Sequence, residues 1–163
     1  MIPSLANAFV FDEPALSESV LKRVFSLRSE QNLHELDHHS TLDRVASRVA
    51  QANLNREDGY ILHVDSKGKR LSDRISEEGY EGFAGEIVAV VYLVPSESTQ
   101  ERIAEEFKNL VRNSKSHYQG LMAQTGHGWT EYGSVLLESR VFKNGYWMQK
   151  YSFALVLGLP GTN

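Results

Sequence analysis

Residues 85–94 of this 163-residue chain read GEIVAVVYLV, and they decide the fold class. From Ile87 to Val94 the run is apolar and rich in β-branched side chains, which is typical of a strand buried on both faces. Pro95 and a Ser/Glu stretch end the run. The pattern predicts a sheet, and we expect the helical segments elsewhere in the chain to pack on it.

Several segments of the chain carry helical signals. The expected ranges are about 14–28, from 40 onward, about 71–78, and 98 to about 114. Asp12 can cap the first of these helices, and Pro14 suits its first turn. Ser40-Thr41-Leu42-Asp43 and Ser98-Thr99-Gln100-Glu101 resemble capping boxes at the starts of the second and the last helix.

The last third of the chain predicts a β-hairpin. Asn144-Gly145 is the strongest short hairpin signal, and it separates two strand-like segments, Tyr132–Phe142 and Tyr146–Leu157. Early helices, an interleaved strand and a final hairpin indicate an α+β fold in which helices pack on the sheet.

Composition is that of a globular protein, with 41% hydrophobic and 23% charged residues and a formal net charge of −4. We expect a single domain over residues 1–163, with residues 1–13 as an N-terminal extension. The charge balance gives no support for nucleic-acid binding, and no segment approaches the ~20 apolar residues that span a bilayer. There are no cysteines, so neither disulfides nor thiolate sites arise. The first residues lack the pattern of a signal peptide, so for an exported protein we expect the signal to precede this numbering.

One short segment matches a known zinc signature. His34-Glu35-Leu36-Asp37-His38 has the H-E-x-x-H form, in which two histidines on a helix bind Zn²⁺ and the glutamate activates water. The flanking residues are too polar for a helix packed on a core, so we favour a loop with Leu33 and Leu36 tucked inward. The zinc helix is kept as an alternative.

A second group of candidates is dispersed along the sequence. Glu86 directly precedes the buried strand, where a carboxylate is costly unless it is paired. His63 follows an apolar segment and could pair with Glu86 through one ring nitrogen, leaving the other for a cleft. His117 follows the polar end of the last helix. Spacing alone gives little reason to place these three residues in one site.

Sequence motifs supply that reason. His63, the turn at 65–68, Arg74, Gly79-Tyr80 and residues 85–89 resemble the core of the CAP superfamily (cysteine-rich secretory proteins, antigen 5 and pathogenesis-related 1), particularly its bacterial SCP-like branch.

The resemblance extends from about residue 18 to 157. Residues 111–117, VRNSKSH, match the bacterial W-x-N-S-x-x-H pattern except at its tryptophan. Two departures concern the site itself. Ile87 replaces the asparagine of the family's Gly-Glu-Asn, and Ser114 falls near the position of a second glutamate found in many eukaryotic members.

The resemblance implies a three-layer α-β-α sandwich in which His63 and His117 meet across a central cleft that also contains Glu86 and Ser114. The two histidines could hold Zn²⁺ or another divalent cation. Glu86 could be a ligand, a residue that orients a histidine, or the base for a bound water, which makes it the candidate catalytic residue. Family members are mostly exported, and the activities proposed for them include binding sterols, other lipids or partner proteins.

Three functions follow as hypotheses. The first is an exported or cell-envelope binding module whose cleft takes a divalent metal or a small ligand, including a lipid, without established catalysis. The second is a zinc-dependent hydrolase or peptidase that uses either His63, Glu86 and His117 or the segment 34–38. The third is a protein that acts through its surface, by contacting lipid or a partner protein. A serine triad through Ser114 or Ser116 is weaker, because no G-x-S-x-G elbow is present.

Overall fold

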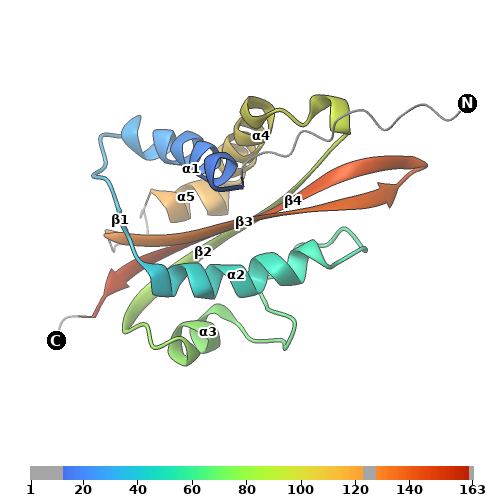
Figure 1. The fold of residues 1–163 in the computed structure, drawn as a ribbon. Helices are drawn as coiled ribbons and strands as arrows, with labels where there is room; N and C mark the ends of the chain where they lie inside the picture. The colour runs from blue at the N-terminus through green and yellow to red at the C-terminus, as the bar shows by residue number, and fades with distance from the viewer. Residues whose placement is uncertain (1–12, 123–127, 162–163) are drawn as a thin grey trace, which may run out of the picture.

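The computed structural model describes residues 13–122 and 128–161, whose elements are shown in Figure 1. In chain order they are α1 (Glu13–Ser29), β1 (Asp37–His38), α2 (Ser40–Leu54), α3 (Leu71–Glu77), β2 (Gly82–Leu93), a 3₁₀ turn η1 (Pro95–Glu97), α4 (Gln100–Asn113), α5 (Lys115–Leu121), β3 (Glu131–Lys143) and β4 (Tyr146–Pro160). Nearly all of the predicted N-terminal extension, with Asp12, lies outside the described residues.

The sheet has the strand order β1-β3-β4-β2. Strand β4 runs antiparallel to both of its neighbours, β2 and β3, as the sequence predicts. Residues 87–93 of the apolar run belong to β2, which lies at the edge of the sheet beside β4. The two-residue strand β1 has no counterpart in the sequence prediction, and it pairs parallel to the start of β3. The sheet is therefore mixed only at this short edge.

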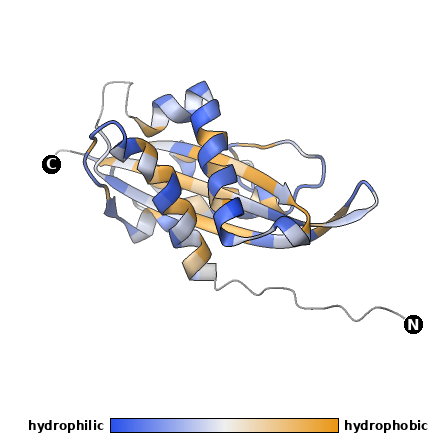
Figure 2. Ribbon diagram, turned by 90° about the horizontal axis from the view of Figure 1, so that it is seen from above, coloured by the Kyte–Doolittle hydropathy of each residue, from blue (hydrophilic) through white to orange (hydrophobic). Residues whose placement is uncertain are grey.

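The helices cover both faces of the sheet, which gives the predicted α-β-α sandwich. In Figure 1, α1, α4 and α5 lie on one face, and α2 and α3 lie on the other. Side chains of β2 alternate between the two cores: Ile87 and Ala89 pack with the α1/α4/α5 layer, whereas Val88 packs with the α2 layer. Figure 2 shows the same division, with apolar strands beneath helices whose outward faces are hydrophilic. The continuous apolar run follows from this double burial.

Helix α2 confirms the predicted apolar stripe but not the predicted cap. The stripe is fully buried and consists of Leu42, Val45, Ala46, Val49 and Ala50. The cap residue is His39 instead of Ser40, since the His39 ring accepts the N–H of Thr41. The side chain of Asp43 accepts the N–H of Ser134 at 2.8 Å instead of capping the helix, so it ties the start of α2 to β3.

Strand β2 begins at Gly82, five residues before the predicted start. The glycines before Glu86 favour a loop in the sequence, but in the structure they pair with the end of β4, where Gly82 lies opposite Pro160. An added Cβ at Gly82 would lie 2.3 Å from the carbonyl oxygen of Leu159, so only glycine permits this pairing. Glu86 therefore lies inside the strand, and its prediction as a residue at the strand's mouth is wrong.

The side chain of Lys150 binds the carbonyls at the C-terminal end of α2. It is 1% exposed, and its Nζ donates to the carbonyls of Asn53, Leu54 and Arg56 at 2.7, 2.8 and 2.5 Å. The last carbonyls of a helix have no partner within the helix, and a cation there is favourable to the helix dipole. The ammonium thus joins the central strand β4 to α2.

We predict that Lys150→Met lowers the free energy of unfolding by about 2–4 kcal/mol, because one buried and two partly buried carbonyls lose a charged donor. Urea denaturation measures the change, and the exposed Lys67→Met is the control. Equal stabilities for the two variants would contradict this role of Lys150.

Candidate functional site

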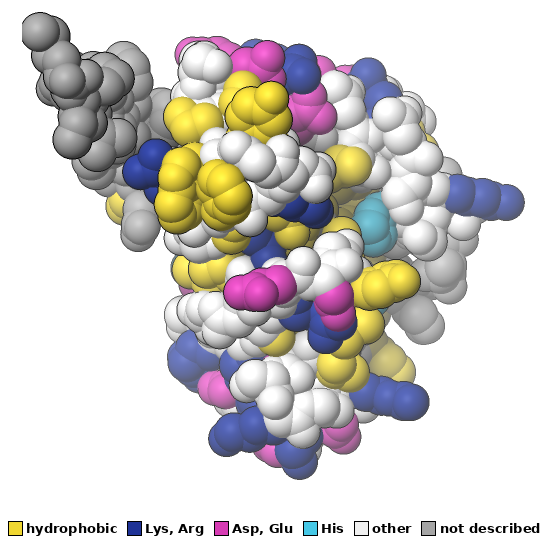
Figure 3. All heavy atoms as spheres, turned by 90° about the vertical axis from the view of Figure 1, so that its right-hand side faces the viewer, with side chains coloured by type: hydrophobic (Ala, Val, Ile, Leu, Met, Phe, Trp, Pro, Cys, Tyr) yellow, Lys and Arg dark blue, Asp and Glu magenta, His cyan; other side chains and the backbone are white. Residues whose placement is uncertain are grey.

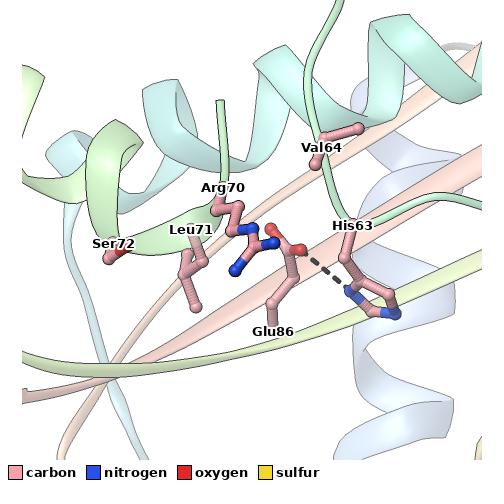
Figure 4. Close-up of a pocket in the computed structure, with 6 residues that line it drawn as sticks. All are labelled: His63, Val64, Arg70, Leu71, Ser72 and Glu86. Atoms are coloured by element: carbon pink, nitrogen blue, oxygen red, sulfur yellow. Dashed lines mark hydrogen bonds and ion pairs between the residues drawn. The ribbon is translucent and has the colours of Figure 1, made fainter. Parts of the chain in front are cut away.

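A buried ion pair lies beneath the candidate site. Glu86 in β2 has a side chain that is only 3% exposed, and its Oε2 accepts a hydrogen bond from Nη2 of Arg74 at 2.6 Å. Its Oε1 lies 3.0 Å from Nδ1 of His63, as Figure 4 shows. A carboxylate only accepts hydrogen bonds, so Nδ1 of His63 is the donor and Nε2 is left for other partners.

Arg74 is the residue whose role the sequence did not reveal. It is fully buried in α3 and also donates to the carbonyl of Val45 in α2 at 2.9 Å. The guanidinium joins α2, α3 and β2, and an arginine remains charged in a protein interior. In the sequence Arg74 stands out only as part of a family pattern, because a polar helix of seven residues carries no burial signal.

The loop that carries His63 is pinned on both sides. Before it, Asn53 in α2 exchanges two hydrogen bonds with the backbone of Leu62, at 2.8 and 2.9 Å. After it, the nearly buried Asp65 accepts two backbone N–H groups of its own turn and the guanidinium of Arg48. The side chain of His63 itself is 54% exposed, so its imidazole faces solvent while hydrogen bonds hold the backbone on both sides of it.

His117 approaches from the opposite layer, on α5. Ser114 is both the end of α4 and the N-cap of α5, and its hydroxyl accepts the N–H of His117. The sequence predicts the end of α4 but not the single short helix that follows. Nδ1 of His117 is buried and has no hydrogen-bond partner among the residues that the structure describes. Burial lowers the pKa of His117 from 6.5, and the charge of nearby His63 lowers it further, so the ring is neutral at pH 7.

Two buried residues hold α5 in place. Nε1 of Trp129 donates to the carbonyl of Gly120 at 2.7 Å, and its ring covers Gly85, where an added Cβ would lie 2.9 Å from Cζ2. Arg28, at the end of α1, donates to the carbonyl of Leu121 at 2.7 Å. Trp129 thus joins α5 to the residue next to Glu86. No sequence signal marks this contact.

The site lies at an edge of the sheet, because among the described strands β2 has a neighbour on one side only. A pocket of about 440 Å³ is found here, lined by His63, Val64, Arg70, Leu71, Ser72 and Glu86 (Figure 4). Among the described residues, no acidic side chain lies within ion-pair distance of Arg70. Ile87, which replaces the family's asparagine, points to the other face and is 2% exposed in the core.

The alternative of a zinc helix at residues 34–38 is wrong. Residues 33–36 have no helical structure, and Asp37–His38 is strand β1. The two rings also have different partners: Nε2 of His34 bonds to the carbonyl of Trp129 at 2.8 Å, and Nε2 of His38 lies 2.6 Å from Asp43. The segment is the predicted loop, and it packs Leu33 and Leu36 against the core.

Within the described part of the chain, no cluster of three or more histidine, aspartate or glutamate side chains has the geometry of a metal site. Ser114 contacts the backbone of His117 and the hydroxyl of Ser116, so it belongs to the helix junction. Both oxygens of Glu86 are already engaged. Of the predicted metal ligands, His63 lines the pocket, whereas His117 is not among its lining residues.

The fold of this chain is similar to those of several solved structures, although its sequence has no match among family models or curated proteins. An extracellular protein from Bacillus anthracis that contains an SCP domain is 18% identical over 85% of this chain, with a TM-score of 0.54. The chain has a CAP-like fold.

Two further structures agree with this fold. A cysteine-rich secretory protein from Staphylococcus aureus is 14% identical over 91% of the chain, with a TM-score of 0.56. An outer surface protein from Borrelia burgdorferi is 21% identical over 87% of the chain, with a TM-score of 0.54, and the match covers 90% of that protein. The matches cover only 40% of the Bacillus and Staphylococcus chains, so the CAP-like part is a fraction of each.

We predict that Arg74→Met lowers the free energy of unfolding by about 3–5 kcal/mol, because Glu86 would remain buried without its cation. The double variant Arg74→Met/Glu86→Leu should recover much of this loss. Urea denaturation of both, with the exposed neighbour Arg70→Met as control, measures the coupling. A loss in Arg74→Met no larger than in the control would contradict the ion pair's importance.

We also predict that His117 titrates below pH 6.5 in the folded protein. The unfolded chain then binds the proton more readily, so the free energy of unfolding is unaffected by this group above about pH 6.5 and falls as the pH drops through the folded pKa. Histidine NMR titration measures the pKa, and His117→Gln removes this part of the pH dependence of stability. A folded pKa above 6.5 would contradict the burial of a neutral ring.

Proposed function

We propose that this protein is an exported CAP-like binding module whose cleft takes a divalent metal ion, Zn²⁺ in the first place, or a small ligand. The observation that carries the proposal is the buried, unpartnered and neutral Nδ1 of His117 beside His63. A buried polar atom without a partner is costly, and such atoms in native proteins commonly mark a ligand or ion site.

An exported or cell-envelope location is supported by the similar structures. Their names describe an outer surface protein, an extracellular protein and a secretory protein. Among the helices that the structure describes, none is long and apolar enough to cross a membrane. The absence of cysteine leaves the fold independent of disulfides in any such location.

The arrangement of His63 suits a metal. Glu86 accepts the hydrogen bond from Nδ1 of His63, so the proton is on Nδ1 and the lone pair of Nε2 is available to a cation. In metalloproteins, carboxylates orient metal-bound histidines in the same way. The neutral imidazole of His117 supplies the second donor. A bound Zn²⁺ would offer a Lewis-acid centre with open positions for an oxygen or nitrogen of a ligand.

The same geometry favours binding over hydrolysis. A general base must be free to accept a proton, whereas Glu86 already accepts hydrogen bonds from Arg74 and His63. Of the three roles left open for Glu86, that of the residue orienting His63 fits these contacts best. Our proposal therefore includes no catalytic step.

A small apolar or amphipathic ligand is the second candidate, and it rests on the residues next to the pocket. Tyr60, Ile61 and Leu62 lie just before His63 and are 72%, 43% and 38% exposed. Val64 and Leu71 line the pocket itself. These side chains could cover the apolar part of a ligand whose polar end contacts the histidines.

We predict that the protein binds Zn²⁺ and that His63→Ala and His117→Ala each weaken this binding at least about tenfold, because each removes one of two ligands. His38→Ala, at the opposite edge of the sheet, is the matched control and should bind as the wild type does. Calorimetric titration with Zn²⁺ at pH 7.5 measures the affinity. If both cleft variants bind Zn²⁺ as tightly as the wild type, the metal site does not exist.

A further inference from the structure

The β3–β4 hairpin continues beyond the rest of the sheet. Strand β2 ends at Leu93, which pairs with Gln149, whereas β3 and β4 stay paired up to Lys143 and Tyr146. We call residues 140–149 the distal ribbon, and Figure 1 shows it projecting at one end of the molecule. Its turn is Asn144-Gly145, with φ of 54° and 84°, as a type I′ turn requires.

Three aromatic side chains of the distal ribbon are exposed to solvent. Phe142, Tyr146 and Trp147 are 62%, 69% and 53% exposed. Phe142 and Trp147 form a cross-strand pair with edge-to-face rings whose centroids lie 5.4 Å apart. This pair helps to hold the two-stranded ribbon together. It leaves Tyr146 and large parts of the other two rings uncovered, and such clusters on a surface mark a contact site.

The charge of the distal ribbon is opposite to that of the whole protein. Residues 140–149 read RVFKNGYWMQ, with two basic residues and no acidic one, in a chain of net charge −4. The guanidinium of Arg140 lies 5.0 Å from the ring of Trp147, and Nζ of Lys143 lies 4.3 Å from the ring of Tyr92. Three acidic residues lie near the base of the ribbon. Asp58 is paired with Arg56, Glu57 lies near Lys150, and Glu138 accepts a hydrogen bond from Gln149.

Figure 3 views the molecule from the side that bears the distal ribbon. Hydrophobic side chains gather there, with lysine and arginine side chains and several acidic side chains among them. The distal ribbon, residues 140–149, has fewer residues than the roughly 20–30 per side of a stable protein interface. Contact with the headgroup region of a bilayer does not require a large interface. This region accommodates a few aromatic rings, and its anionic groups attract cations.

We propose that the distal ribbon is a membrane-contact element that places Phe142, Tyr146 and Trp147 in the headgroup region of an anionic lipid bilayer. Tryptophan and tyrosine have an apolar ring with a polar group, which is why they favour this region. Arg140 and Lys143 supply the attraction to anionic lipid. The residues of the distal ribbon are different from those of the cleft, so the proposal does not depend on metal binding by His63 and His117.

The test is sedimentation of the protein with vesicles of phosphatidylglycerol and phosphatidylcholine in equal amounts, compared with pure phosphatidylcholine. We expect binding to the anionic vesicles that weakens with added salt. The triple variant Phe142→Ser/Tyr146→Ser/Trp147→Ser should lose at least about tenfold in vesicle affinity. Arg140→Gln and Lys143→Gln should each lose about fivefold.

Phe83→Ser is the matched control, because Phe83 is 64% exposed and lies at the opposite end of β2 from the distal ribbon. It should bind vesicles as the wild type does. Fluorescence gives an independent signal: of the two tryptophans, Trp129 is 8% exposed and Trp147 is 53% exposed, so a blue shift on vesicle binding reports Trp147 and should vanish in Trp147→Phe.

Three outcomes would overturn the proposal. The first is no sedimentation with anionic vesicles, and the second is equal binding by the triple variant while circular dichroism shows both proteins folded. The third is self-association of the wild type through the distal ribbon without vesicle binding, measured by sedimentation equilibrium. That result would assign the ribbon to contact between copies of this chain.

Discussion

The rest of the site depends on the ion pair between Arg74 and Glu86. Burying either charge alone would cost several kcal/mol, and the pair offsets much of this cost only while both side chains stay in hydrogen-bond contact. Because Arg74 also holds a carbonyl of α2, the pair fixes the distance between α2, α3 and the edge strand. The second oxygen of Glu86 then fixes the orientation of His63. A single buried contact thus connects the α2/α3 layer of the sandwich with the solvent-facing imidazole.

The position of β2 at the edge of the sheet explains why residues from both helical layers can meet there. A central strand would be covered on each side by a neighbouring strand, whereas β2 leaves one side open. The loop with His63 reaches this side from the α2/α3 layer, and α5 with His117 reaches it from the other. Trp129 holds α5 against Gly85, next to Glu86, so α5 is fixed at the edge strand.

Much of the fold was predictable because its signals are local. The buried strand, the helix stripe of α2 and the Asn-Gly turn each depend on a few neighbouring residues. The sequence did not reveal features set by distant contacts. Glu86 lies within a strand because glycines before it pair with β4, and Arg74 is buried because α2 and β2 surround it. For His63 and Glu86, the cost of an unpaired carboxylate suggested a pairing, and the family resemblance supplied the reason to expect it.

Lys150 has a consequence for the hairpin that it helps to anchor. Its ammonium fixes β4 to the end of α2 one residue before the distal ribbon begins to run free of β2. The ribbon therefore extends from a fixed base, because a shift of β4 at Lys150 would break three hydrogen bonds to its ammonium. Lys150 thus connects the base of the ribbon to the C-terminal end of α2, whose Asn53 also holds the backbone beside His63.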